Sequence, residues 1–304
     1  MNVLHNPHLR LFVGAVLISF SPVFVKLVSV APTTSAFYRV LVGGLVLTGF
    51  LIVTRRRLFF TRIAWCSLVV AAVFFALDLW FWHRSIVYIG PGLATLLANL
   101  QVFFMIAAGM IVLGQRPSSL QFIAAPMAIG GLAMIVGTDW GGLTQSYRVG
   151  VVFGVLTAVS YAGYMLSMRR ARLESRYAVP VPEVAIMSLI AAALLGSAAI
   201  LEGESLAIPT ALDAGWLLSY GLLAQVVGLL FIASSLDKVT TTETGIALLL
   251  QPSLSFIWDI AFFGRSLSLL EALGAIVTLS AIFLGSMRRS IAARHGDSQP
   301  GRIQ

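Results

Sequence analysis

Charged residues are scarce in this chain. Only 11% of its 304 residues are charged and 59% are hydrophobic, whereas a soluble domain carries about a quarter charged residues. The charges cluster in short breaks between apolar runs of about 20 residues, the length that spans a bilayer core. Strand-like alternation is also lacking, which excludes an outer-membrane barrel. Backbone polar groups in hydrocarbon need internal partners, so the apolar runs are predicted to be membrane helices.

Cysteine and catalytic motifs are nearly absent as well. The single cysteine, Cys66, has no partner for an internal disulfide or a metal site, so it is interpreted as a packing residue and no metal or other cofactor is expected. A P-loop is missing, which leaves ATP coupling unsupported, and so are the His-Glu-x-x-His, Gly-x-Gly-Asp and Gly-x-Ser-x-Gly motifs. The chain is therefore not expected to be an enzyme. An intramembrane enzyme or a channel stays as an alternative, although no filter motif or charged ring is visible.

Ten runs are long and apolar enough to be spans. They separate into two predicted repeats of five, residues 10–137 and 149–287, joined by a Gly/Trp/Asp-rich periplasmic link at 138–148. Residues 1–9 form a short cytoplasmic lead, and 288–304 form a basic tail that is predicted to be disordered. The predicted spans are 10–30, 34–54, 63–86, 91–113, 120–137, 149–168, 183–201, 214–236, 243–263 and 268–287.

The distribution of Lys and Arg predicts the orientation. Ten spans place both termini on one side, and fifteen basic residues fall in the segments of that side against three in the opposite ones, Arg84, Arg148 and Arg265. The positive-inside rule then predicts cytoplasmic termini in a multi-pass protein of the bacterial inner membrane. This topology explains the net charge of +8 better than nucleic-acid binding does, because the basic residues lie at helix ends.

The two halves resemble each other. Residues 81–131 and 231–281 align without a gap and share eight identities, including Gln101 with Gln251 and Gly114 with Gly264. Apolar sequences match by composition, but here the hairpin break, the polar Gln and the Gly-turn-Ser-x-Leu pattern also fall in register. Since each half has five spans, the second starts on the opposite side of the membrane. The predicted fold is an all-α polytopic protein of ten transmembrane helices in two inverted five-helix repeats, an architecture common in secondary transporters.

These features resemble a known family. A span that ends in an aromatic residue and Ser, a Gly/Pro turn, a small-residue helix and then Leu-Gly-Gln-Arg-Pro-Ser at 113–118 is similar to the EamA-type drug/metabolite transporter superfamily. The family turn is typically Gly-Glu-Arg, and Gln115 stands here in place of Glu. The resemblance implies a ten-helix carrier that exports small metabolites, with amino acids, aromatic ones included, among the substrates. Drugs and other metabolites are the alternative cargo.

Ionisable groups inside the spans are the first site candidates. Asp78, Lys26 and Arg39 lie in three different spans, in the half near the outer face. A charge at a helix centre costs about 2.5–3.5 kcal/mol on insertion scales, so each needs a reason. With His83 they can form an ion pair or network that holds a substrate carboxylate or ammonium group, or that couples transport to protons; the alternative is snorkelling or a structural pair. Asp259, one turn from the outer end of its span, is expected to be solvated.

Polar and aromatic residues at helical spacing are the second set. Thr157, Tyr161, Tyr164 and Met168 recur at i, i+4, i+7 and i+11, which places them on one helix face. A cavity for a zwitterion with an apolar side chain needs such aromatic walls and a few amides or hydroxyls. The alternative role for each is an interhelical hydrogen bond, worth about 0.6 kcal/mol. The cavity candidates are Asp78, Trp82, Thr95, Asn99, Gln101, Tyr161, Tyr164, Gln225, Thr244, Gln251 and Ser255.

Gln101 and Gln251 lead this set, because the repeat puts the same amide in both halves. Small residues, including Gly43, Gly130 and Gly131, are expected to let helices pack closely. The expected mechanism is alternating access, with the halves rocking about a central cavity and the fifth and tenth spans peripheral. The expected partners are a small-molecule substrate and the lipid bilayer, with no nucleic acid, and the chain is expected to be a monomer or a weak homodimer. The exact substrate and proton coupling stay open.

Overall fold

The computed structural model describes residues 6–55, 58–113, 118–137, 140–175, 177, 179–235, 239 and 241–286. Every regular element within these residues is helical. Nine of the helices found there are long and apolar enough to cross a membrane, and a tenth apolar helix over Ala247–Phe263 is shorter. The predicted fold class, an all-α protein of ten spans in two inverted five-helix repeats, is confirmed.

The helices follow the predicted apolar runs closely, and three spans are divided into shorter segments. The first half contains α1 (Pro7–Ser19), α2 (Ser21–Leu27), α3 (Pro32–Val53), α4 (Arg62–Ile89), α5 (Pro91–Ala98), α6 (Gln101–Leu113) and α7 (Ser119–Val136). The second half contains η1 (Trp140–Gly142), α8 (Gln145–Leu173), α9 (Val181–Leu201), α10 (Ala211–Ser219), η2 (Tyr220–Gly228), α11 (Leu229–Ala233), α12 (Thr241–Phe263) and α13 (Leu269–Ser286).

The divisions lie in the middle of the bundle. The first span breaks at Phe20, where Pro22 cannot donate a backbone hydrogen bond to the preceding turn. The fourth span breaks at Asn99 and Leu100, between α5 and α6. The eighth span passes through η2, which is a π-helix. Each break ends an α-helical hydrogen-bond ladder inside the membrane, where such groups must find other partners.

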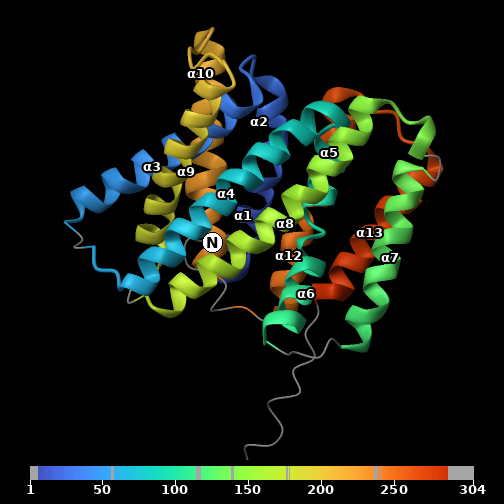
Figure 1. Cartoon of the computed structure of the whole chain (residues 1–304), viewed down its shortest axis with the longest axis horizontal. Helices are drawn as coiled ribbons and strands as arrows, with labels where there is room; N and C mark the ends of the chain where they lie inside the picture. The colour runs from blue at the N-terminus through green and yellow to red at the C-terminus, as the bar shows by residue number, and fades with distance from the viewer. Residues whose placement is uncertain are drawn as a thin grey trace, which may run out of the picture.

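Three helix pairs dominate the packing: α4 with α8, α3 with α9, and α7 with α13. The last pair lies at one edge of the molecule (Figure 1). Its helices approach closely because Gly131 and Gly274 face each other: a Cβ on Gly131 would stand 2.8 Å from the Gly274 carbonyl oxygen. Gly130 faces open space, so only one of these two adjacent glycines serves the predicted close packing.

Cys66 does not have the packing role predicted for it. It lies in the first turns of α4 and is exposed. A position within an apolar run does not specify which face of the helix a residue occupies. The face of α4 that packs in the bundle is formed by Ala64, Leu68, Ala71 and Ala72.

Candidate functional site

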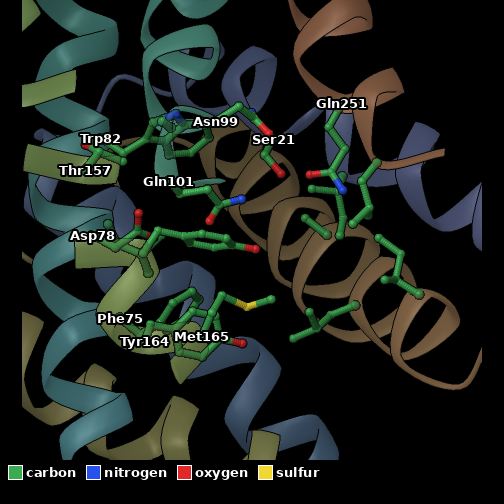
Figure 2. Close-up of a pocket in the computed structure, with 18 of the residues that line it drawn as sticks. Ser21, Phe75, Asp78, Trp82, Asn99, Gln101, Thr157, Tyr164, Met165 and Gln251 are labelled. Carbon is green, nitrogen blue, oxygen red and sulfur yellow. The ribbon is translucent and has the colours of Figure 1, made fainter. Parts of the chain in front are cut away.

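A cavity of about 520 Å³ lies among the central helices of both halves. Figure 2 shows Gln101 and Gln251 pointing into it from opposite sides, with Ser21 between them and Asp78, Phe75 and Tyr164 on the Gln101 side. Candidates from the sequence that line it are Arg39, Asp78, Trp82, Thr95, Asn99, Gln101, Tyr161, Tyr164, Gln225, Gln251 and Ser255.

Asp78 and Arg39 place a carboxyl group and a guanidinium on the same cavity. Asp78 is 6% exposed and makes no hydrogen bond or ion pair with any described residue. Arg39 donates from Nε to Gln225 Oε1 at 3.2 Å and from Nη1 to Tyr220 Oη at 2.9 Å. The predicted network therefore does not form as a direct Asp78–Arg39 pair. The carboxyl group and the guanidinium share the cavity, and each can still meet a ligand.

A directed chain of hydrogen bonds stands behind Arg39. Tyr220 is fully buried, accepts from Arg39 and lies 3.3 Å from His83 Nε2. His83 Nδ1 lies 2.7 Å from the Leu79 carbonyl oxygen, which can only accept. This pattern assigns the proton of His83 to Nδ1 and leaves Nε2 to accept from Tyr220. His83 thus lies behind the cavity wall and is linked to Arg39 by hydrogen bonds through the Tyr220 hydroxyl.

Three buried polar atoms at the cavity have no partner among the described residues. They are Ser21 Oγ, Thr95 Oγ1 and Gln101 Oε1. Buried polar groups are nearly always hydrogen-bonded, and an unsatisfied one costs about 1–3 kcal/mol. All three belong to residues that line one cavity, so its wall holds unused hydrogen-bonding groups. Asn99, by contrast, donates from Nδ2 to the Thr95 carbonyl oxygen at 2.8 Å.

One wall of the cavity is aromatic and sulfur-rich. The helical stripe of Thr157, Tyr161, Tyr164 and Met168 lines it along α8. Tyr164 also packs on Phe75 of α4, with ring centroids 4.8 Å apart. Flexible Met side chains and aromatic faces accept apolar groups of varied shape. Lining residues absent from the sequence candidates include Phe75, Met105 and Met165, of which Phe75 could have been found, because it lies three residues before Asp78 on the same helix face.

The remaining candidates lie elsewhere or serve the packing. Lys26 is exposed at the end of α2, away from the cavity. Ser255 lines the cavity but its hydroxyl donates to the Ser19 carbonyl oxygen at 3.1 Å. The side chain of Thr244 lies outside the described part of the chain.

At one end the cavity reaches the ends of α8 and α9. Arg169, Arg172 and Pro180 line this end. Arg172 donates to Glu183 Oε1 at 2.7 Å, which ties α8 to α9 beside the mouth. This is the side on which the sequence concentrates its basic residues.

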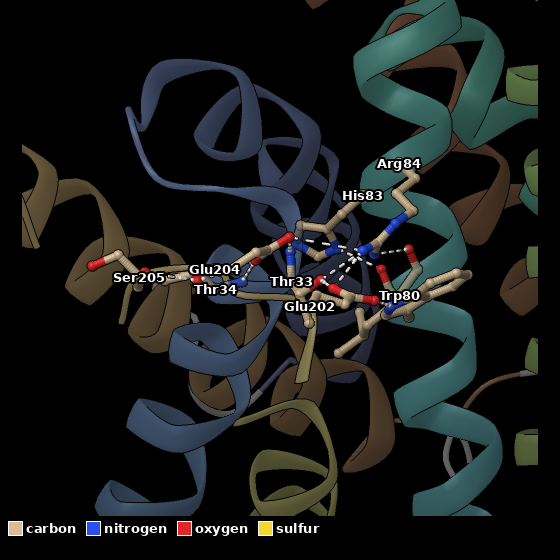
Figure 3. A network of polar contacts seen from close by, with 9 residues as sticks. Thr33, Thr34, Trp80, His83, Arg84, Glu202, Glu204 and Ser205 are labelled. Carbon is tan, nitrogen blue, oxygen red and sulfur yellow. Dashed lines mark hydrogen bonds and ion pairs between the residues drawn. The ribbon is translucent and has the colours of Figure 1, made fainter. Parts of the chain in front are cut away.

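The opposite side is closed by polar contacts between the halves (Figure 3). Arg84 Nη2 lies 2.6 Å from Glu202 Oε2 and 2.9 Å from Thr33 Oγ1, and the guanidinium lies 3.8 Å from the centre of the Trp80 ring. Glu204 Oε2 accepts from the backbone N–H of Thr34 at 2.9 Å, near the N-terminus of α3. A carboxylate of the second half therefore caps a helix of the first half, as the positive end of the helix dipole favours.

Asp259 repeats this arrangement, so the expectation that it is solvated is wrong. It is 3% exposed, and its Oδ2 accepts from the Gly92 backbone N–H, at the start of α5, at 3.0 Å. Arg265 lies 3.5 Å from the same oxygen and donates to the Ile89 carbonyl oxygen at 3.2 Å. The position near a helix end suggested exposure, but α5 supplies N–H groups that need an acceptor. Gly90, with φ of 84°, makes the turn into α5 that a residue with Cβ would adopt only with strain.

A duplicated helical bundle around a membrane-embedded cavity is the architecture of a secondary transporter. The chain belongs to the EamA-like transporter family, whose model matches it twice, over residues 7–137 and 148–287. This confirms the family resemblance seen in the sequence. Curated relatives named "Uncharacterized inner membrane transporter YhbE", from Escherichia coli K12 and Shigella flexneri, are each 27% identical over 278 residues, covering 86% of this chain and 84% of the relative. A solved crystal structure with 17% identity superposes with a TM-score of 0.62 over 91% of this chain and 95% of its own, which supports the fold alone.

Proposed function

We propose that this chain exports small metabolites, with aromatic or hydrophobic amino acids as the first substrate class, across the cytoplasmic membrane by alternating access. One observation carries the proposal: the cavity combines a carboxylate without a described partner, a guanidinium and an aromatic wall. A zwitterion with an apolar side chain matches all three. The family, and the similarity of the chain to proteins named as inner membrane transporters, support transport in that membrane.

The orientation proposed from the sequence gives the cavity a direction. With the arginine-rich side in the cytoplasm, the cavity reaches the cytoplasm between α8 and α9, where Arg169 lines it. The contacts of Arg84 and Asp259 then lie on the periplasmic side and hold the halves together. The described conformation is therefore interpreted as inward-facing.

Export then needs a second conformation. Substrate entering from the cytoplasm brings an ammonium group to Asp78 and a carboxylate toward Arg39, which offsets the cost of keeping these charges away from water. Opening the far side requires the halves to separate where Glu204 and Asp259 cap α3 and α5. The contacts that close the periplasmic side and those that would close the cytoplasmic side form in different conformations and compete. This competition is how a carrier avoids being open to both sides at once.

The test is uptake in proteoliposomes. The purified protein should move labelled phenylalanine or leucine across liposomes and show competition by other amino acids, and repeating the assay with and without a pH gradient separates proton coupling from downhill flow. Absence of transport over a broad panel of amino acids and other metabolites would overturn the proposal.

The two glutamines give the first mutational test. Gln101→Ala and Gln251→Ala should each change the KM for uptake at normal membrane expression, because each removes an amide that faces the cavity. Gln145→Ala is the matched control, since Gln145 is exposed at the start of α8. Unchanged uptake kinetics in both cavity variants would remove the glutamines from the substrate path.

A further inference from the structure

The π-helix η2 is the least expected element of the bundle. It covers nine residues in the middle of the eighth span, between α10 and α11. π-Helices are rare, appear mostly as single turns and are frequent at functional sites. A longer run inside a membrane span, beside the cavity, therefore needs a reason in terms of the side chains that it places.

The π turn brings Tyr220 and Gln225 onto one face. In a π-helix the hydrogen bond joins i to i+5, so residues five apart stand one above the other. In an α-helix, with 3.6 residues per turn, the same two positions would point in clearly different directions. Here both reach Arg39: the Tyr220 hydroxyl accepts from Nη1 at 2.9 Å and Gln225 Oε1 accepts from Nε at 3.2 Å.

We call Tyr220 and Gln225, which both accept hydrogen bonds from Arg39, the clamp. The packing around the clamp fixes it in place. Gln225 is fully buried and donates from Nε2 to Ser188 Oγ at 3.0 Å, which sets the direction of its amide. Two glycines let α3 approach η2: a Cβ on Gly43 would stand 2.9 Å from Gln225 Cβ, and one on Gly221 would stand 2.5 Å from Val42 Cβ. The clamp is therefore part of a closely packed interface, and its two hydrogen bonds hold the guanidinium in one position in this conformation.

The clamp leaves donors of Arg39 free. A guanidinium has five N–H groups, and the described contacts engage Nε and one position on Nη1, while no described residue accepts from Nη2. Arg39 also lines the cavity and lies over the Tyr220 ring at 5.0 Å from its centre. Asp78 lines the same cavity and forms no ion pair with Arg39. The geometry keeps the carboxyl group apart from the guanidinium.

We propose that Arg39 binds the carboxylate of the substrate, that Tyr220 and Gln225 are positioning residues that aim it through the π turn, and that Asp78 binds the ammonium group. This rests on the proposed transport function and narrows its substrate class to zwitterions. Arg39 suits the carboxylate because its planar fork can make two parallel hydrogen bonds. A substrate that lacks either charged group leaves one buried charge unpaired.

The experiment compares L-phenylalanine with two probes that each lack one of its charged groups: phenethylamine lacks the carboxylate, and 3-phenylpropionate lacks the ammonium group. Binding to purified protein is measured by titration. The wild type should prefer phenylalanine to each of the others by on the order of 10-fold or more, the usual effect of losing a charged hydrogen bond. Arg39→Gln should abolish the preference over phenethylamine, and Asp78→Asn the preference over 3-phenylpropionate. Arg39→Lys, which keeps the charge, should retain part of the first preference.

The positioning role has its own readout. Tyr220→Phe and Gln225→Leu should lower the preference for phenylalanine over phenethylamine by roughly 3- to 10-fold, and neither should lower it further in the Arg39→Gln background, as a shared interaction requires. Tyr38→Phe is the matched control, because its hydroxyl donates to the Leu206 carbonyl oxygen and lies off the cavity. Thermal unfolding of each variant reports its folding.

The outcomes separate the two proposals. A wild type that transports amino acids but binds all three probes equally, or an Arg39→Gln variant with the wild-type preference, overturns the Arg39 assignment and leaves the transport function standing. Equal effects of Tyr220→Phe in the presence and absence of Arg39 overturn the positioning role. If the protein neither transports nor binds any amino acid, both proposals are overturned.

Discussion

Removal of the Arg84 guanidinium should open the side of the cavity that the structure closes. Exposed ion pairs contribute about 0–1 kcal/mol, but the Arg84 and Glu202 side chains are only 16% and 30% exposed. Replacing Arg84 removes its charge-assisted hydrogen bonds to Glu202 and Thr33 and its contact with the Trp80 ring. In return, Glu202 keeps its bonds from Trp80 Nε1 and Thr33 Oγ1 and regains water. The net loss to the closed state is therefore about 2 kcal/mol, which is roughly 30-fold in the conformational equilibrium.

Labelling of a cavity cysteine measures this equilibrium. The background is Cys66→Ser, since the native cysteine is exposed, and Ser21→Cys places a thiol on the cavity. A membrane-impermeant maleimide is added on the side of Arg84. Arg84→Gln should raise the labelling rate from that side by roughly 10- to 30-fold. Arg169→Gln at the other end of the cavity is the control and should not raise it.

A double-mutant cycle sharpens the test. Arg84→Gln and Glu202→Gln remove the same contact, so the double variant should label little faster than either single variant. An unchanged labelling rate in Arg84→Gln, with Ser21→Cys still reached from the opposite side, would refute the assignment of this cluster as a closing contact.

Two further predictions concern pH and packing. Partial burial alone would raise the pKa of Glu202, but hydrogen bonds from Thr33 and Trp80 and the charge of Arg84 outweigh it and hold that pKa below its ordinary value of 4.5. The ion pair between Arg84 and Glu202 is therefore complete above pH 4.5 and is lost as pH falls through the lowered pKa. The labelling rate from the Arg84 side, divided by the rate of the Arg84→Gln variant at the same pH to cancel the change in thiolate fraction, should accordingly stay constant down to pH 4.5 and rise as pH falls through the lowered pKa of Glu202, and Glu202→Gln should remove this rise. Gly131→Ala should destabilise the protein by about 1–3 kcal/mol, because its Cβ would meet the α13 backbone, whereas Gly130→Ala faces open space and should be neutral or slightly stabilising in thermal unfolding; equal melting temperatures for the two variants would contradict the close approach of α7 and α13.

The sequence predicts features that depend on local period. Apolar runs give the ten spans, because their length has to match the bilayer. The spacing of Thr157, Tyr161, Tyr164 and Met168 places all four on one helix face, and all four line the cavity. Gln101 and Gln251 also line it together, as expected from their equivalent places in the two halves. What these residues bind stays a prediction.

Features that depend on another segment, or on a change of helical period, were not predictable. The sequence does not predict Tyr220 as a site residue, because an α-helical period separates it from Gln225 and nothing in the sequence indicates the π turn that joins them. The prediction that Asp259 is solvated is wrong because its partner, the N–H of Gly92, lies 167 residues away. The Gly-Pro-Gly break at 90–92 did carry a signal, since it exposes helix N–H groups that need an acceptor.

The carboxylate caps on the first half have a consequence for biosynthesis. Glu204 and Asp259, which satisfy the N-termini of α3 and α5, belong to the second half of the chain. During synthesis the first five spans are made before either acid exists, and their helix ends must wait for the later repeat to insert with opposite orientation. The first repeat is therefore not a finished folding unit by itself, and the second half of the chain completes it.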